Sequence, residues 1–263
     1  MAALVATRDA HIETIAEGKG PLVVILPSRG RGAGDYDEVA RGIAKAGYRV
    51  LRPQPRGIGR STGPMKGLTL HDLARDVAEV IAHEQIEHAG GPAVVVGHAF
   101  GNWVARMTAA DHPKLVRGVA ILAAAAKKYP AALAEAVTKC ADPSLAGAER
   151  LKYLQLAFFA PGHDARDWLE GFYPEVNASQ RAAGLATPQE AWWGAGDAPL
   201  LDLQAEQDAF RPRETANDLR EELGGRVSVV VVPDAGHALV PEQPAAVVAA
   251  LVDWVGKLPQ WRS

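Results

Sequence analysis

The sequence predicts an α/β fold, namely a doubly wound, mostly parallel sheet with an inserted helical cap. Three observations lead to this prediction. Short runs of Val, Ile and Leu that are apolar on both faces recur along the chain, as in buried parallel strands. Helical patterns separate most of these runs, as in βαβ units. One interval, residues 124–196, is too long for a single crossover between strands.

The elements follow one another in the order that such a sheet needs. A candidate hairpin at Leu4–Ala16 would add antiparallel strands at one edge. The candidate strands of the main sheet come next, at Leu22–Leu26, Tyr48–Leu51, Ala93–Val96, Val116–Leu122, Pro199–Leu203 and Val227–Val232. The long interval carries helical stretches at Pro130–Lys139 and Ala148–Phe159, interrupted by prolines. We therefore expect a core made of residues 1–123 and 197–263 and a helical cap made of residues 124–196.

Length and charge restrict the class of protein. With 263 residues, 48% of them hydrophobic, the chain is long enough for one large domain with an insertion. The formal net charge of −3 provides no broad basic surface for nucleic acid. The N-terminus lacks a basic segment followed by an apolar core, and no apolar stretch reaches the roughly 18 residues of a membrane span. We expect a cytoplasmic protein that acts on a small molecule, without nucleic-acid or membrane partners.

A sharp strand-to-helix turn is predicted at residues 97–101. The apolar run that ends at Val96 continues directly into Gly-His-Ala-Phe-Gly and then into a helical pattern. The motif G-x-S-x-G marks a turn so tight that only small residues fit on either side of its serine. Gly97 and Gly101 provide the small residues, and alanine stands at position 99 in place of the serine. Because such a turn strains its central residue, we expect unusual backbone angles at Ala99.

The residues just past each strand are the next candidates, because a doubly wound sheet binds its ligand outside the carboxyl ends of its strands. Asp208 follows the candidate strand at Pro199–Leu203, and His237 follows the last strand, inside Ala-Gly-His-Ala. Together with position 99, they give the chain order nucleophile position, acid, histidine. Asp202 and Glu206 lie close to Asp208 in the sequence and are the alternative acids.

These features resemble the α/β-hydrolase fold with a helical cap, and the resemblance covers nearly the whole chain. The stretch Leu26-Pro-Ser-Arg-Gly30 is similar to the oxyanion loop of that family, and Gln54-Pro-Arg-Gly-Ile-Gly-Arg-Ser61 resembles its D-x-R-G-x-G-x-S segment. There are two departures. Gln54 stands in place of Asp, which we expect to affect only the anchoring of a loop. Ala99 stands in place of serine, which removes the covalent step that the family normally uses.

The resemblance implies a role for each residue at a matching position. His237 would take the proton of the nucleophile and later return it, while Asp208 would hold the imidazole in the correct tautomer. The backbone N–H groups of Arg29 and Phe100 would form the oxyanion hole, the second of them near a helix N-terminus. His98, inside the turn, is expected to pack behind it.

Aromatic residues of the cap are the candidate substrate-binding residues. A lid over this sheet has to pack and also to line a pocket, so we expect an apolar pocket above position 99 to be roofed by Trp168, Tyr173 and at least one of Trp192 and Trp193. Ser28 is grouped with them as a hydroxyl near the predicted oxyanion hole, one that is used locally and is not a relocated nucleophile. Arg29 and Arg31 would attract an acidic substrate, but exposed loop arginines usually contact only water.

We expect neither a nucleotide cofactor nor a metal. The glycines at 30–34 are spaced G-x-G-x-G, not G-x-G-x-x-G, and the next strand ends without an acid to hold a ribose. His83 and His88 are five residues apart, about 140° around a helix, and so do not share a face. Cys140 is the only cysteine, which allows no intramolecular disulfide and indicates a passive thiol.

Three interpretations of Ala99 remain open. In the first, the protein is an enzyme that hydrolyses a small ester, lactone or amide, and its nucleophile has been removed. Alternatively, alanine is native and the pair Asp208 and His237 acts as a general base without a covalent intermediate, as in a lyase or a water-activating hydrolase. In the third, the chain binds a small molecule without catalysis. We place the hydrolase first, because a binding protein has no chemical need for the acid and the histidine.

Overall fold

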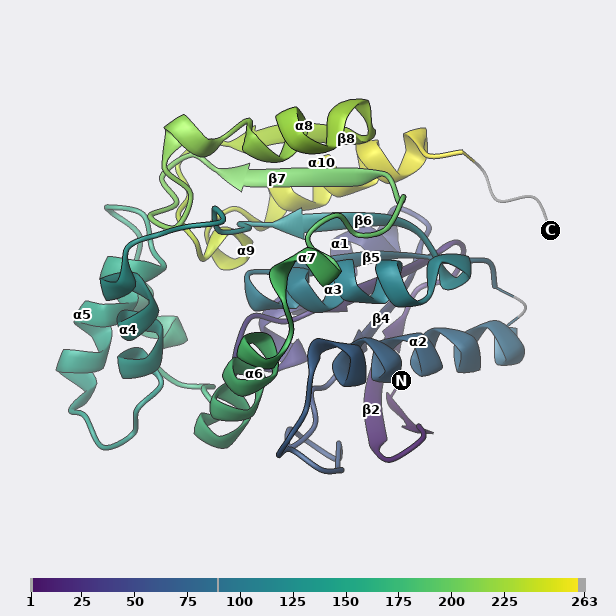
Figure 1. Cartoon of the computed structure of the whole chain (residues 1–263), viewed down its shortest axis with the longest axis horizontal. Coiled ribbons are helices and arrows are strands. Elements are labelled where there is room, and N and C mark those ends of the chain that lie inside the picture. Colours follow the sequence, from purple (N-terminus) through teal and green to yellow (C-terminus); the bar gives the residue numbers. More distant parts are fainter. Residues whose placement is uncertain (1, 89, 260–263) are drawn as a thin grey trace.

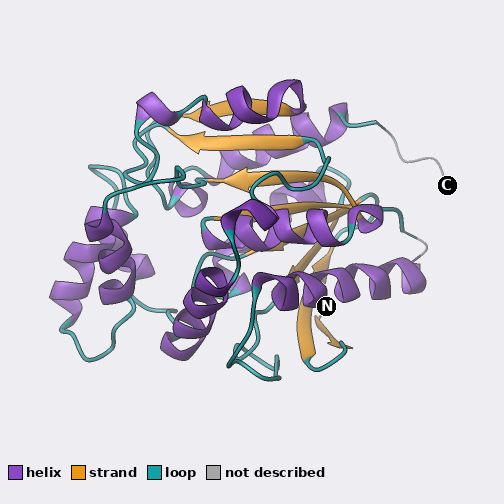
Figure 2. Cartoon of the chain, in the orientation of Figure 1, coloured by secondary structure: helices purple, strands orange, loops and turns teal. Residues whose placement is uncertain are grey.

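In a computed structural model, which describes residues 2–88 and 90–259, the chain folds around an eight-stranded sheet with helices on both faces (Figures 1 and 2). The strands are β1 (Ala2–Ala6), β2 (His11–Glu17), β3 (Leu22–Leu26), β4 (Arg49–Pro53), β5 (Ala93–His98), β6 (Val116–Leu122), β7 (Leu200–Ala205) and β8 (Val227–Val232). Their order in the sheet is β1-β2-β4-β3-β5-β6-β7-β8. The pairs β1–β2 and β2–β4 are antiparallel and the remaining pairs are parallel. The predicted fold class is therefore confirmed.

Helices enclose the sheet and extend beyond its carboxyl edge. The α-helices are α1 (Asp37–Lys45), α2 (Leu70–His88), α3 (Phe100–Asp111), α4 (Ala131–Cys140), α5 (Gly147–Ala157), α6 (Pro174–Ala186), α7 (Gln189–Trp192), α8 (Asp218–Leu223), α9 (Leu239–Glu242) and α10 (Pro244–Lys257). Short 3₁₀ turns are η1 (Ala33–Tyr36), η2 (Pro113–Leu115), η3 (Ala165–Trp168), η4 (Arg213–Thr215) and η5 (Gly224–Arg226). Helices α1 and α10 pack on one face of the sheet, and α2 and α3 pack on the other (Figure 1).

The central strands are apolar on both faces because both faces are covered. In β5, Val94 and Val96 belong to the apolar core under α1 and α10, whereas Val95 belongs to the core under α2 and α3. At the edge, β2 alternates between exposed or half-buried and buried residues, as expected for an antiparallel strand with one face in solvent. The turn between β1 and β2 is closed by the Thr7 N–H, which donates to the Ala10 carbonyl, and does not use Gly18 or Gly20.

The chain between β6 and β7 is helical and carries α4, α5, α6 and α7. In Figure 1, α4 and α5 lie beyond the arrowheads of β6 and β7, at the carboxyl edge of the sheet. Their apolar side chains form a cluster that also includes Phe210 and Ala238 from the core. We call residues 124–196 the insertion; its treatment as a separate cap domain stays a prediction.

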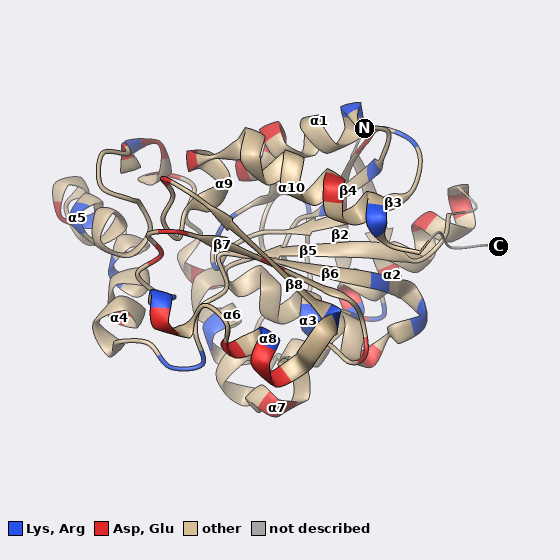
Figure 3. Ribbon diagram, turned by 90° about the horizontal axis from the view of Figure 1, so that it is seen from above, with Lys and Arg blue, Asp and Glu red and all other residues tan. Residues whose placement is uncertain are grey.

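Charged residues are distributed over the molecule without a dominant sign. Acidic and basic residues are interspersed along the outer helices (Figure 3), in agreement with the formal net charge of −3. Within residues 2–88 and 90–259, no helix is both long enough and apolar enough to cross a membrane.

Candidate active site

Ala99 lies at the turn between β5 and α3 in a strained backbone conformation. Its φ of 48° and ψ of −117° are unusual for a residue with a side chain, and such angles cost about 1–3 kcal/mol unless the surroundings impose them. The surroundings do so here, because the Ala99 N–H donates to the Leu122 carbonyl of β6 at 3.0 Å. The Asn102 N–H returns a bond to the Ala99 carbonyl at 3.1 Å. The unusual backbone angles predicted for Ala99 are therefore present.

The two glycines of the turn are required by close backbone contacts. A Cβ atom on Gly97 would lie 2.3 Å from the carbonyl oxygen of Gly101. A Cβ atom on Gly101 would lie 2.4 Å from the carbonyl oxygen of Leu26, at the end of β3. The second contact means that the loop after β3 is pressed against the N-terminus of α3, which brings Ser28 and Arg29 beside position 99.

Asp208 and His237 form a buried pair. The Nδ1 atom of His237 is 3.0 Å from both carboxylate oxygens of Asp208, and Asp208 also accepts the Phe210 N–H at 2.8 Å. Because an ionised carboxylate only accepts hydrogen bonds, Nδ1 carries the proton in this arrangement. Nε2 is then left with a free lone pair, and no group in the described part of the chain is bonded to it.

The alternative acids lie elsewhere. Asp202 is fully buried and accepts from Arg211 Nη2 at 2.9 Å and from Gln204 Nε2 at 2.8 Å. Burial raises the pKa of Asp202, while the Arg211 charge opposes that shift. Glu206 is exposed. Asp208 is therefore the acid that the fold pairs with His237.

A cavity at the carboxyl edge of the sheet brings most of the predicted site residues together. It is lined by Ser28, Arg29, Ala99, Phe100, Asn102, Trp103, Ala125, Tyr129, Val137, Phe158, Phe210 and His237. The backbone N–H groups of Arg29 and Phe100 have no acceptor among the described residues. The cavity thus combines position 99, a histidine and two free N–H donors.

Behind the turn, a buried chain of hydrogen bonds joins three of the loops at the site. The Ser28 N–H donates to the Tyr36 hydroxyl at 2.8 Å, and the Tyr36 hydroxyl is 2.8 Å from His98 Nδ1. On its other side, His98 Nε2 is 2.7 Å from the His237 carbonyl oxygen. A carbonyl only accepts, so Nε2 carries the proton and Tyr36 donates to Nδ1. Burial and the neighbouring His237 lower the pKa of His98 to about 3, which keeps the ring neutral.

The expected local use of the Ser28 hydroxyl is wrong. Ser28 is bound to Tyr36 through its backbone N–H, and its hydroxyl has no hydrogen-bond partner within the residues that the structure describes. Gln54 agrees with the expectation of loop anchoring, since its Oε1 atom accepts the Ala33 N–H at 2.9 Å. Cys140 is buried, and burial raises the pKa of its thiol to about 12.

The predicted aromatic roof is also wrong, because none of its four residues lines the cavity. Tyr173 is 40% exposed at the start of α6. Trp168 is buried between the Arg31 guanidinium, 4.5 Å from its ring, and the edge of Phe159. Trp192 and Trp193 belong to the core beside α3, where the Arg106 guanidinium lies 5.5 and 4.6 Å from their rings.

Other residues form the wall of the cavity. From the insertion come Tyr129, Val137 and Phe158, and from the core comes Phe210. Phe158 and Phe210 pack on the His237 ring, with centroids 5.4 and 4.3 Å away. Asn102 was also missed; its Oδ1 atom is buried without a partner. The only sequence signal for Asn102 was its position, as a polar residue directly after Gly101 of the turn.

The two loop arginines differ in a way that the sequence did not indicate. Arg31 is buried and paired: it donates to Asp35, and also to the Trp168 and Glu170 carbonyls at 3.0 and 2.7 Å. Arg29 lines the cavity, and its Nε and Nη2 atoms are buried without partners. Arg31 is therefore not the exposed, water-contacting side chain that was expected, whereas Arg29 is half-buried.

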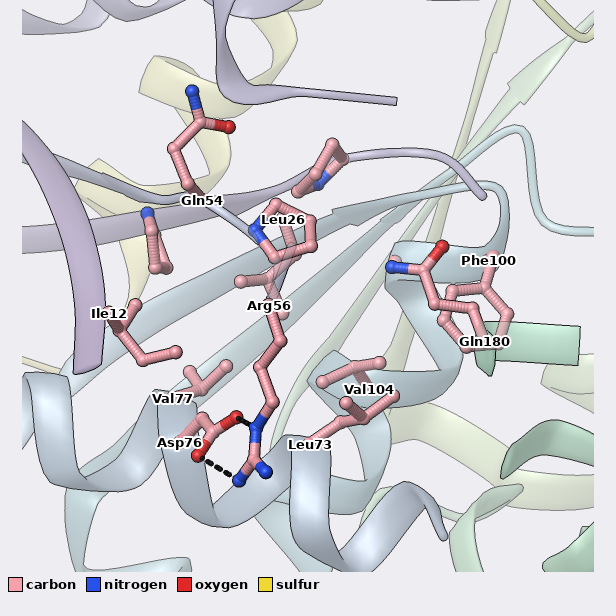
Figure 4. Close-up of a pocket in the computed structure, with 14 residues that line it drawn as sticks. Ile12, Leu26, Gln54, Arg56, Leu73, Asp76, Val77, Phe100, Val104 and Gln180 are labelled. Carbon is pink, nitrogen blue, oxygen red and sulfur yellow. Dashed lines mark hydrogen bonds and ion pairs between the residues drawn. The ribbon is translucent and has the colours of Figure 1, made fainter. Parts of the chain in front are cut away.

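A second cavity, shown in Figure 4, shares Phe100 with the first. It is mostly apolar, and the Arg56 side chain within it points to Asp76, with Nε–Oδ2 and Nη2–Oδ1 distances of 2.7 and 2.8 Å. Neither Ala99 nor His237 lines it. The chemistry described above therefore belongs to the first cavity.

Comparison with known proteins places this geometry in context. A model of the alpha/beta hydrolase family matches residues 23–251. The chain is 29% identical to the pimeloyl-[acyl-carrier protein] methyl ester esterase of Chromobacterium violaceum, over 88% of this chain and 91% of that protein. It is 24% identical to the pyrethroid hydrolase of Sphingobium wenxiniae, over 92% and 89%. The solved structure of the enol-lactonase from Burkholderia xenovorans LB400 superimposes with a TM-score of 0.80, at 20% identity, over 97% of this chain and 100% of that one.

Proposed function

The chain belongs to the alpha/beta hydrolase family, and we propose that its site binds a small ester, lactone or amide and adds water to the carbonyl, with the methyl group of Ala99 in place of the nucleophilic hydroxyl. One observation supports this most strongly. His237, held by Asp208, lines the same cavity as Ala99 and two unbonded backbone N–H groups, those of Arg29 and Phe100. Acyl transfer needs these parts together.

Each part has a defined task in this proposal. The carbonyl carbon lies over Ala99, and its oxygen accepts from the N–H groups of Arg29 and Phe100. A water molecule fills the space that a serine hydroxyl would take, attacks the carbon and gives a proton to His237 Nε2. The resulting oxyanion is stabilised by the two N–H donors and by the N-terminus of α3.

Collapse of the tetrahedral intermediate completes the reaction. The bond to the leaving oxygen or nitrogen breaks, and His237 returns the proton to that atom. Asp208 accepts the Nδ1 hydrogen bond throughout and stabilises the imidazolium. The names of the relatives, an esterase, a pyrethroid hydrolase and an enol-lactonase, support an ester or lactone carbonyl as the reacting group. Without a serine no acyl-enzyme forms, so we expect turnover to be slow.

Restoring the hydroxyl tests the proposal. In Ala99→Ser, we expect hydrolysis of 4-nitrophenyl acetate to rise on the order of 10³-fold or more, because loss of a triad nucleophile costs up to about 10⁶ in kcat. An active-site phosphonate should label the new serine, and His237→Ala in the same background should abolish both effects. Circular dichroism and urea unfolding of Ala99→Ser check that the added oxygen has not disturbed a tight site.

Ala123→Ser is the matched control. Ala123 is also a buried alanine with positive φ, 46°, at the end of the neighbouring strand, but it does not line the cavity. It should gain neither activity nor label. A well-folded Ala99→Ser protein that is not labelled would contradict the proposal. In that case, His237-dependent turnover by the alanine form of a substrate other than an ester, lactone or amide would identify a general-base lyase, and its absence would identify a binding protein.

A further inference from the structure

Arg29 is half-buried, and two nitrogen atoms of its guanidinium are buried without a partner. Arg29 lies in the loop between β3 and η1 and lines the cavity that holds Ala99 and His237. Its Nε and Nη2 atoms are shielded from solvent and donate to nothing in residues 2–88 and 90–259. Leaving a charged group in this condition is unfavourable, because removal from water is not compensated by an opposite charge or hydrogen bonds.

No acidic side chain is available to compensate it. Among the residues that line the cavity, none is Asp or Glu. The groups whose charges act on Arg29 are Tyr129, Arg181 and Cys140, and burial is the main cause that lowers the pKa of Arg29. Arginine nevertheless stays protonated in proteins. The cavity therefore contains one net positive group and no anion.

The unpaired edge of Arg29 is the one that this protein uses to hold carboxylates. Nε–H and Nη2–H project in parallel and match the two oxygens of a carboxylate. Elsewhere in the described chain, the same edge donates to a carboxylate in the pairs Arg31–Asp35, Arg49–Glu84 and Arg56–Asp76. Figure 4 shows the last of these pairs. No side chain of the described residues accepts from the corresponding edge of Arg29.

We propose that the substrate carries a carboxylate, which the Nε and Nη2 groups of Arg29 bind while the reacting carbonyl lies over Ala99. The inference rests on the proposed function and names its substrate class: esters, lactones or amides that bear a carboxylate a few bonds from the carbonyl. The carboxylate must lie close to the reacting carbonyl in the substrate, because both are bound by Arg29. Its backbone N–H binds the carbonyl oxygen and its side chain binds the carboxylate. Tyr129 also lines the cavity, and its hydroxyl has no hydrogen-bond partner within the residues that the structure describes.

Binding to the protein as it exists gives the first test, because it requires no turnover. Succinate and its neutral analogue succinamide are titrated into the alanine form by calorimetry. We expect succinate to bind about 10- to 100-fold more tightly, the range for hydrogen bonds to a charged group. Arg29→Met should remove the difference, and Arg29→Lys should keep part of it. Equal binding of the two compounds, or a preference that survives in Arg29→Met, would overturn the inference.

Kinetics in the Ala99→Ser background give the second test. The ratio of kcat/KM for 4-nitrophenyl hydrogen succinate to that for 4-nitrophenyl pentanoate should be about 10 or more and should fall to about one in Arg29→Met. Arg41→Met, which alters an exposed arginine on α1, should leave the ratio unchanged. Absence of ester turnover in Ala99→Ser would defeat the proposed function alone, since the succinate titration does not depend on it.

Stability separates a binding role from a structural one. Because Nε and Nη2 of Arg29 are buried and unpaired, Arg29→Met should unfold at the same or a higher temperature than the parent protein. Succinate should raise the unfolding temperature only when Arg29 is present. If Arg29 instead held the loop in place, Arg29→Met would lower the unfolding temperature with or without succinate, and that result would contradict the inference.

Discussion

The strand-end loops and the insertion face the same cavity but contribute different things to it. The loops after β3, β5 and β8 provide backbone N–H groups, the strained turn at Ala99 and the imidazole of His237. The insertion provides the side chains of Tyr129, Val137 and Phe158. Under the proposed function, the loops supply the groups that react, whereas the insertion, together with the Arg29 side chain, selects the molecule that fits.

Gly97→Ala should have the largest effect, because the loops depend on backbone contacts that cannot yield. The new Cβ would lie 2.3 Å from the Gly101 carbonyl oxygen, so we expect a loss of about 3–5 kcal/mol in the free energy of unfolding, measured with urea. Gly34→Ala is the control, since a Cβ on Gly34 meets nothing within 4 Å. Equal stability of the two variants would show that the turn is looser than described.

Tyr36→Phe should cost about 2–3 kcal/mol, because it leaves the Ser28 N–H and His98 Nδ1 buried without partners. It should also lower esterase activity in the Ala99→Ser background, since the Ser28 loop carries the proposed Arg29 donor. Tyr48→Phe removes a hydroxyl with no partner in the described residues and should change stability by less than about 0.5 kcal/mol. A Tyr36→Phe protein as stable as Tyr48→Phe would contradict the bracing role of the buried chain.

His98 should make the stability of the loops depend on pH. Its pKa in the folded protein, about 3, lies below its ordinary value of 6.5, so the unfolded chain binds the proton more readily. The contribution of the neutral His98 ring to the free energy of unfolding is therefore complete above about pH 6.5 and is lost as the pH falls toward 3. Between pH 6.5 and 5, urea unfolding should show the parent protein losing about 2 kcal/mol more than His98→Gln, which does not titrate. Parallel pH profiles would refute this.

Val137→Ala should have the smallest effect, because it changes only the wall that the insertion provides. In the Ala99→Ser background, we expect a few-fold shift in the kcat/KM ratio of 4-nitrophenyl hexanoate to acetate, as one or two methyl groups are worth about 1–2 kcal/mol in such a pocket. Val176→Ala, in α6 and buried away from the cavity, should leave the ratio unchanged. A fall in the acetate rate as large as in the hexanoate rate would mean that the insertion acts on the reaction itself.

The strand-end loops and the wall of the cavity also differ in how far the sequence could predict them. The turn at Ala99 and the limits of β3, β6 and β8 could be predicted, because glycine spacing and apolar runs act through local backbone geometry. The pairing of Asp208 with His237 was implied by the resemblance to the α/β-hydrolase fold. The cavity wall could not, because it depends on distant partners. Trp192 packs in the core against Trp103 and Arg106. Arg31 donates to Asp35 and to two carbonyls of the insertion, whereas the Nε and Nη2 atoms of Arg29 have no partner among the described residues.

One contact between the two regions has a spectroscopic consequence. Trp103 of α3 and Trp192 of α7 are stacked with centroids 4.9 Å apart and planes inclined by 21°. Two indoles this close couple their electronic transitions and give a paired positive and negative band in circular dichroism, which a single tryptophan does not. Because one ring belongs to the core and the other to the end of the insertion, the amplitude of that band reports whether the insertion is seated on the core. The protein thus carries an intrinsic optical signal for the packing of α7 against α3, readable without any attached label.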